Sequence, residues 1–193
     1  DGTLLQKGWN TREFDDSGWK RALPASGKGA DWEKALLRGQ LQPPVRVVGD
    51  YPAKFLHVFS GAGEEAEIYD LGQNTTGILE FDVIGKKGNQ IRIYPAEKLT
   101  TDGDADQMAK NWMLSDTCIT YRIGQDDVWE HDRMRFTYFA GRYLRVVCER
   151  AAGKTAENRP RIAHLTAHAI TAAWKRDGSF SCDDKRFEQI YDL

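Results

Sequence analysis

The stretch Ile68–Leu99 constrains the fold of this 193-residue chain more than any other part of the sequence. Apolar and polar residues alternate along Gly77–Ile84, and they alternate again along Asn89–Pro95. Alternation with a period of two buries one face of each segment, as in β-strands. Gly88 and the residue after it suit a turn that requires positive φ, so the two strands are predicted to form a hairpin.

A polar corner, Gly72-Gln73-Asn74, interrupts the apolar pattern within this stretch. Glycine permits a sharp turn, and side-chain amides can satisfy buried backbone groups. We therefore interpret this corner as a packing signature at the edge of the fold.

Further strands are predicted from Ala53 onward, most of them bounded by Gly, Asp or Asn. They are Ala53–Phe59, Ala66–Leu71, Asp116–Ile123, Arg133–Phe139, Tyr143–Glu149, Ile162–Thr171 and Gly178–Ser181. Many short strands with turn signals and little helix indicate an all-β protein, and we expect an antiparallel, jelly-roll-like β-sandwich. The sandwich domain is expected to span residues 51–181.

The two ends of the chain do not follow the strand pattern. Residues 1–50 show no regular period, and we expect an extended strap that lies on the sandwich through its tryptophans. In residues 182–193 the side chains of Phe187, Ile190 and Tyr191 fall on one helical face, which predicts a short C-terminal helix. With the abrupt start at Asp1, this truncated helix indicates a piece of a longer polypeptide.

Composition argues against several functional classes. The formal net charge is −2 and no basic stripe is present, which argues against a nucleic-acid partner. No apolar run reaches about 18 residues, so no membrane span is predicted. Cys118, Cys148 and Cys182 lack Cys-x-x-Cys spacing, which argues against zinc. We interpret Cys118 and Cys148 as buried free thiols, although one disulfide with a leftover thiol stays open.

Three aspartates alternate as in the first part of a calcium-binding loop: Asp102, Asp104 and Asp106. An EF-hand needs Gly at its sixth position and Glu at its twelfth. Those positions hold Gln107 and Met113, so the EF-hand is excluded. No cofactor is predicted, but an irregular calcium site on these carboxylates stays as a hypothesis beside a solvated acidic turn.

Glu97 and several polar and aromatic residues are the candidates for sugar contact. Glu97 ends a predicted strand beside the long connection Thr100–Ser115, which contains Asn111 and Trp112, and Trp129 precedes another strand. An aromatic ring with polar neighbours is a natural platform for the apolar face of a sugar. The alternative is that these rings close one end of the sandwich. No pair of carboxylates is singled out by spacing, so no catalytic residue is predicted.

His164 and His168 lie on one face of a predicted strand. A zinc site there lacks third and fourth ligands. We interpret both histidines as ordinary sheet residues.

Several short segments follow one another in a characteristic order along the chain. They are Asp15–Lys20, Gln40–Val47, Asp70–Asn74, Ala96–Leu99, Arg135–Phe139 with Gly141–Tyr143, and Gly178–Cys182. Taken together, this set resembles the bacterial α-L-rhamnosidases of glycoside hydrolase family 78.

The resemblance implies a modular protein in which β-sandwich domains precede an (α/α)6 barrel. That barrel carries the acidic pair, which hydrolyses terminal α-L-rhamnosides with inversion. Residues 1–50 would then be the tail of a preceding sandwich, and residues 182–193 would begin the linker helix to the barrel. The catalytic carboxylates are expected beyond Leu193.

The function implied by the resemblance is a noncatalytic sandwich that scaffolds the barrel of the same polypeptide. A rhamnose-containing glycan is the expected second partner, and a periplasmic or secreted location is favoured over a cytoplasmic one. Two alternatives stay open. One is a carbohydrate-binding module with its own sugar site, and the other is a structural or assembly sandwich.

Overall fold

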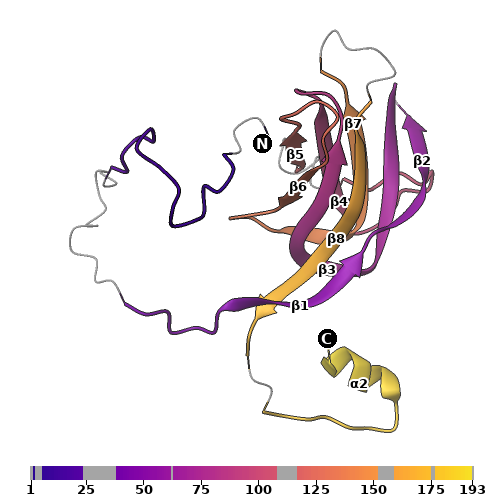
Figure 1. Ribbon diagram of the computed structural model, residues 1–193. Coiled ribbons are helices and arrows are strands. Elements are labelled where there is room, and N and C mark those ends of the chain that lie inside the picture. Colours follow the sequence, from indigo (N-terminus) through magenta and orange to yellow (C-terminus); the bar gives the residue numbers. More distant parts are fainter. Residues whose placement is uncertain are drawn as a thin grey trace, which may run out of the picture.

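The computed structural model describes residues 2, 6–23, 38–61, 63–107, 117–151, 159–174 and 177–192. Every strand pairing in this part of the chain is antiparallel. The chain is an antiparallel β-sandwich, so the predicted fold class is confirmed (Figure 1). The elements are β1 (Val45–Pro52), β2 (Lys54–Gly61), β3 (Glu64–Ile84), β4 (Gln90–Ala96), β5 (Ile119–Arg122), β6 (Glu130–Arg133), β7 (Phe139–Glu149), β8 (Arg161–Ala172) and α2 (Lys185–Asp192).

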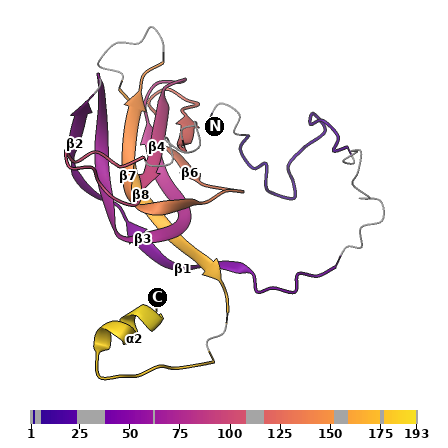
Figure 2. The ribbon, with the colours of Figure 1, turned by 180° about the vertical axis from the view of Figure 1, so that it is seen from behind.

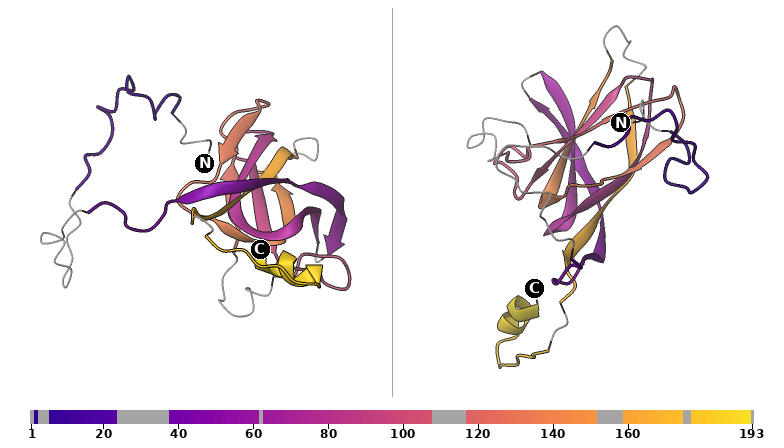
Figure 3. Two further views of the ribbon diagram at one scale, coloured as in Figure 1. Left: turned by 90° about the horizontal axis from the view of Figure 1, so that it is seen from below. Right: turned by 90° about the vertical axis from the view of Figure 1, so that its left-hand side faces the viewer.

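Strand β3 belongs to both layers of the sandwich. Its first part pairs with β2 and β7, and its last part pairs with β8 and β6. One layer therefore contains β2, the start of β3, β7, β4 and β5, while the other contains β1, β8, the end of β3 and β6 (Figure 3). The register with β7 shifts between Asp70 and Thr75, and Gly72 in this bulge has a φ of 81°.

The predicted corner at residues 72–74 is therefore a bend within one strand. Gly72 supplies the unusual φ, as expected. Gln73 and Asn74 are exposed, however, so the prediction that their amides satisfy buried backbone groups is wrong. The Asp70 carboxylate holds the corner instead. It accepts a hydrogen bond from the Gly72 backbone N–H at 2.7 Å and two from the Arg142 guanidinium.

One hydrophobic core lies between the layers, and its side chains come from both of them. Burying these apolar side chains is the main force that holds the two layers together. The core contains Leu71, Leu79, Phe81, Val83, Ile91, Ile93, Tyr121, Ile123, Met134, Phe139, Leu144, Val146, Cys148, Leu165 and Ala167. The alternation in the sequence predicted the inward faces of β3 and β4 correctly.

The predicted hairpin between the end of β3 and β4 is wrong. β4 pairs with β5 and β7, not with β3. Gly88 has a φ of 87°, as the turn prediction required, but the turn carries the chain from one layer to the other. Alternation indicates which face of a strand is buried, but it does not indicate which strand lies beside it.

Strand β1 begins at Val45, inside the segment expected to be a strap. It pairs with β8 along Val45–Pro52, so these residues form the edge of a layer. Residues 6–23 and 38–44, which precede β1, run outside the sandwich (Figure 2). Trp9 lies under the guanidinium of Arg135, with the Arg135 Cζ 5.1 Å from the ring centre. Trp19 packs on Phe14 within its own segment, at 5.3 Å between ring centres.

Two strand predictions near the C-terminal half are wrong. Residues 134–138 form an irregular connection between β6 and β7, in which Phe136 takes a φ of 60°, outside the range of regular strands. Residues 178–181 lead to α2 without strand pairing.

Helix α2 (Lys185–Asp192) confirms the predicted C-terminal helix, and the Asp184 carboxylate caps it by accepting a hydrogen bond from the Arg186 backbone N–H at 3.0 Å. Among the described residues, no helix has the length and apolar character needed to cross a bilayer.

Candidate functional site

A cavity of about 640 Å³ opens where β4 ends, and Glu97 lies on its wall. Its lining is mainly apolar, and its volume falls within the range of about 300–1,000 Å³ found for small-molecule sites. The side chains come from the end of β4, the turn after it, β5 and the connection to β7. The lining residues are Pro95, Ala96, Glu97, Lys98, Asp106, Gln107, Thr117, Cys118, Ile119, Thr120, Met134, Thr137, Tyr138, Phe139 and Ala140.

A tight turn after β4 shapes one side of this cavity. Leu99 and Ala105 form a bridge, and the Asp106 backbone N–H donates to the Lys98 carbonyl at 3.0 Å. The Gln107 side-chain amide donates to the Pro95 carbonyl at 2.6 Å, which ties the turn back to the strand. The acidic segment predicted as a loop is therefore a closed hairpin-like turn.

The three aspartates of this turn point to separate partners. Asp102 accepts from the Thr100 hydroxyl at 2.5 Å, and this hydrogen bond holds the pKa of Asp102 below its usual range. Asp104 accepts from Arg145 Nε at 2.9 Å. Asp106 lies 3.3 Å from Lys98 Nζ.

The structure thus does not bring the carboxylates of Asp102, Asp104 and Asp106 together. Within the described ranges, no group of three or more His, Cys, Asp or Glu side chains is arranged to hold a metal ion. A calcium ion needs six or more oxygen ligands around it, and this turn directs its carboxylates apart.

Trp129, another candidate sugar-contact residue, is not part of the cavity. It is half exposed and precedes β6. The guanidinium of Arg161 lies over its ring, with Cζ at 6.0 Å from the ring centre. Asn111 and Trp112 lie outside the described residues.

Sequence reasoning missed the aromatic side of the cavity. Tyr138 is exposed, whereas Met134 and Phe139 are buried, and all three line the cavity. The prediction of a strand through Arg133–Phe139 had assigned these side chains to a regular sheet. Strict alternation from Arg133 to Tyr138 favoured that strand, and only the two adjacent rings of Tyr138 and Phe139 broke the pattern.

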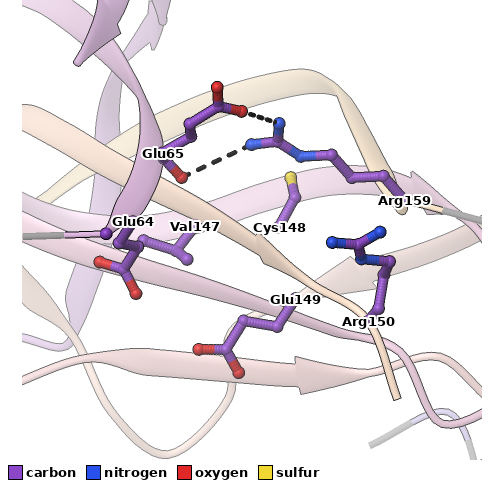
Figure 4. A pocket seen from close by; sticks show the side chains of 8 residues that line it. Glu64, Glu65, Val147, Cys148, Glu149, Arg150 and Arg159 are labelled. Carbon is purple, nitrogen blue, oxygen red and sulfur yellow. Dashed lines mark hydrogen bonds and ion pairs between the residues drawn. The ribbon is translucent and has the colours of Figure 1, made fainter. Parts of the chain in front are cut away.

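A second hollow, of about 630 Å³, is shallow and polar (Figure 4). In it Arg159 pairs with Glu65, and Cys148 lies on the floor beside Arg150. Burial raises the pKa of the Cys148 thiol to about 12, so the thiol is protonated at neutral pH and is not a nucleophile. Cys118, Cys148 and Cys182 are all free thiols, which answers the question of a disulfide.

Known proteins resemble this chain in both sequence and fold. Residues 61–169 fit the family model of the bacterial alpha-L-rhamnosidase concanavalin-like domain. The chain belongs to this family. The resemblance seen in the sequence is thereby confirmed.

Relatives of the family are much longer than this chain. A curated alpha-L-rhamnosidase from Streptomyces avermitilis is 29% identical over 161 residues, which cover 83% of this chain and 15% of that protein. The solved alpha-L-rhamnosidase from Dictyoglumus thermophilum matches with a TM-score of 0.71 and 26% identity, over 99% of this chain and 20% of that chain. The Streptomyces avermitilis alpha-L-rhamnosidase solved in complex with L-rhamnose matches with a TM-score of 0.64 and 25% identity, over 86% of this chain and 15% of that chain.

Proposed function

We propose that this chain is a noncatalytic β-sandwich of an α-L-rhamnosidase, and that it supports a catalytic domain in the same polypeptide. The observation that carries the proposal is the mismatch in length. The chain covers only 15% of the Streptomyces alpha-L-rhamnosidase and 20% of the Dictyoglumus one. Most of each relative therefore lies outside the matched part.

The chemistry of the cavity supports a noncatalytic role. Glycoside hydrolysis needs two carboxylic groups on either side of one bond, one of which is kept protonated in a water-poor setting. In the cavity Glu97 is exposed, and Asp106 is ion-paired with Lys98. This supports the proposal that the catalytic carboxylates, with the inversion expected of them, lie in a barrel outside residues 1–193.

Helix α2 supports a role as a connection to that barrel. Its apolar side chains Phe187, Ile190 and Tyr191 are exposed, and none of its residues is buried. Tyr191 packs on Phe180, at 5.6 Å between ring centres. A helix with an uncovered apolar face suits packing on a further domain.

The test compares this chain with a longer polypeptide that continues beyond Leu193. Both are incubated with an aryl α-L-rhamnoside, and release of the aryl group is measured. We expect the chain alone to fold, as shown by its circular dichroism, without releasing the aryl group. The longer polypeptide is expected to release it and to give the inverted sugar anomer. Turnover by the folded chain alone would overturn the proposal.

A second candidate function is carbohydrate binding at the cavity beside Glu97. The supporting observation is that the cavity combines an exposed ring, Tyr138, with polar groups from Glu97 and Gln107. Stacking on a ring and hydrogen bonds to hydroxyl groups are the contacts that a sugar requires. Rhamnose, with its methyl group, also suits the apolar part of the lining.

Titration with L-rhamnose, followed by amide NMR shifts, tests this candidate. We expect shifts confined to the cavity lining, and their loss in Tyr138→Ala and Glu97→Gln. Glu65→Gln, in the separate hollow of Figure 4, is the matched control and is expected to behave as the wild type. Repeating the titration with calcium checks whether the acidic turn contributes. If no shifts appear up to high L-rhamnose concentration, this second function is excluded.

A further inference from the structure

Three of the four histidines in the chain gather on the outer face of the β1–β8–β3–β6 layer. Each lies against one or two carboxylates from a neighbouring strand. We call this set the histidine–carboxylate network; it consists of His131, His164, His168, Asp50, Glu80 and Asp82. The proposed function above does not use this network, because none of its residues lines the cavity.

His168, on β8, lies between carboxylates from two other strands. Its Nδ1 is 2.7 Å from Asp50 Oδ1 on β1, and its Nε2 is 3.1 Å from Glu80 Oε2 on β3. The His168 side chain is only 14% exposed. A neutral imidazole has one N–H, whereas an ionised carboxylate can only accept. Both contacts are therefore hydrogen bonds only when His168 is the doubly protonated imidazolium.

Asp82 forms the second centre of the network. Its two oxygens lie 2.8 Å from His131 Nδ1 and 2.5 Å from His164 Nδ1. His164 occupies the irregularity in the pairing of β3 with β8, where its φ is 50°. A bulge of this kind redirects a side chain, and here it turns His164 towards Asp82. Hydrogen bonds from these histidines hold the pKa of Asp82 below its usual range.

The protonation of the histidines determines the net charge of the network. Besides the histidines, Arg133 faces Glu80 from β6 at 3.5 Å, and Asp132 and Arg135 line the adjoining hollow with Glu80 and His131. When the histidines are neutral, the carboxylates Asp50, Glu80 and Asp82 outnumber Arg133. When the histidines are charged, positive charge prevails in the network.

We propose that the histidine–carboxylate network is a pH-sensitive clamp that holds edge strand β1 on β8 and β3 in acid and loosens it as histidine loses its proton. β1 pairs with β8 and packs Tyr51 against the core, and the side-chain link from Asp50 through His168 to Glu80 adds a connection from β1 across β8 to β3. Charged His168 can donate to both Asp50 and Glu80, whereas a neutral imidazole has one N–H and can donate to only one of them. The stabilisation is thus present at acidic pH and is lost as the pH rises through the histidine range, about pH 5 to 8.

Hydrogen exchange of the peptide that contains β1 tests the clamp. Protection factors, corrected for the intrinsic effect of pH on exchange, are compared between about pH 5.5 and about pH 8. In the wild type we expect protection of β1 to fall by about tenfold, as for loss of one hydrogen bond to a charged group. His168→Gln is expected to give the lower protection at both pH values.

Two further variants keep the test decisive. Asp50→Asn changes an exposed side chain, retains the fold, and is expected to reduce the pH effect on β1. His57→Gln is the matched control, because His57 lies in the other layer, with its Nε2 3.1 Å from the Gly103 carbonyl. It is expected to keep the full pH effect. An unchanged pH effect in Asp50→Asn and His168→Gln, or protection of β1 that rises with pH, would overturn the proposal.

Discussion

Glu130 is the residue on which the closure of the β5–β6 connection depends. It is only 8% exposed, and its carboxylate accepts hydrogen bonds from the Tyr121 hydroxyl at 2.8 Å and from the backbone N–H groups of Gly124 and Gln125. Burial and this hydrogen bond raise the pKa of Tyr121. A buried carboxylate is stable only with such a set of donors, so Glu130 has a structural role that composition and spacing did not reveal.

We expect Glu130→Gln to reduce the free energy of unfolding by about 2–3 kcal/mol. The glutamine amide brings its own N–H groups to a site where backbone N–H groups already point, so at least one buried donor loses its acceptor. Urea unfolding measures the loss. The matched control is Glu149→Gln, where a partly exposed ion pair with Arg92 at 3.1 Å is worth less than about 1 kcal/mol. Equal losses in the two variants would contradict this role.

At the scale of elements, the bend in β3 is the feature that allows one strand to serve two layers. Gly72 takes a φ of 81°, and Asp70 fixes the bend by binding its backbone and Arg142 on β7. The Arg142 hydrogen bonds are the main reason that the pKa of Asp70 lies below its usual range. The bend is thus held by a charged group, and acid is expected to weaken it.

Asp70→Asn should destabilise the sandwich at neutral pH by about 1 kcal/mol, a modest value because Arg142 is partly exposed. A carboxyl whose pKa is lowered by folding stabilises the protein above its ordinary pKa and loses this effect as the pH falls through the lowered value. The difference in the free energy of unfolding between wild type and Asp70→Asn, measured by urea unfolding, should therefore become smaller from about pH 7 to about pH 3. Asp16→Asn, in an exposed turn, is the control. A difference in the free energy of unfolding that grows in acid would contradict this role of the Asp70 carboxylate.

For the molecule as a whole, the sequence predicted the parts where alternation is strong. β4, β7 and β8 lie close to their predicted ranges, because their inward residues, such as Ile91, Val146 and Leu165, recur with a period of two. β1 was missed because Val45, Val47 and Val48 are all exposed, so edge pairing and not burial makes it a strand. The cavity was only half predicted. Glu97 was identified, but the side formed by residues 134–139 depends on an irregular connection and long-range pairing.

The uncovered face of α2 leads to a prediction at the same scale. In the chain alone, Ile190→Ala is expected to change the thermal midpoint little, within about 0.5 kcal/mol of stability, because α2 contributes no buried residue. Leu144→Ala, in the core, is the contrast and is expected to cost about 2–5 kcal/mol. In a polypeptide that continues beyond Leu193, Ile190→Ala should destabilise measurably. An effect of the same size in both lengths of chain would contradict packing of α2 on a further domain.

The sharing of β3 between the layers also affects how the protein folds during synthesis. β3 takes partners that precede it, in β2, and partners that follow it as late as β8 (Arg161–Ala172). On the ribosome, the end of β3 therefore emerges long before the strand that covers its edge. The layer that contains β8 cannot be completed early, and one edge of β3 stays unpaired until residue 172 has left the exit tunnel. Unpaired strand edges of this kind are prone to aggregate and are bound by chaperones, so the yield of folded protein should depend on the rate of translation through residues 85–172.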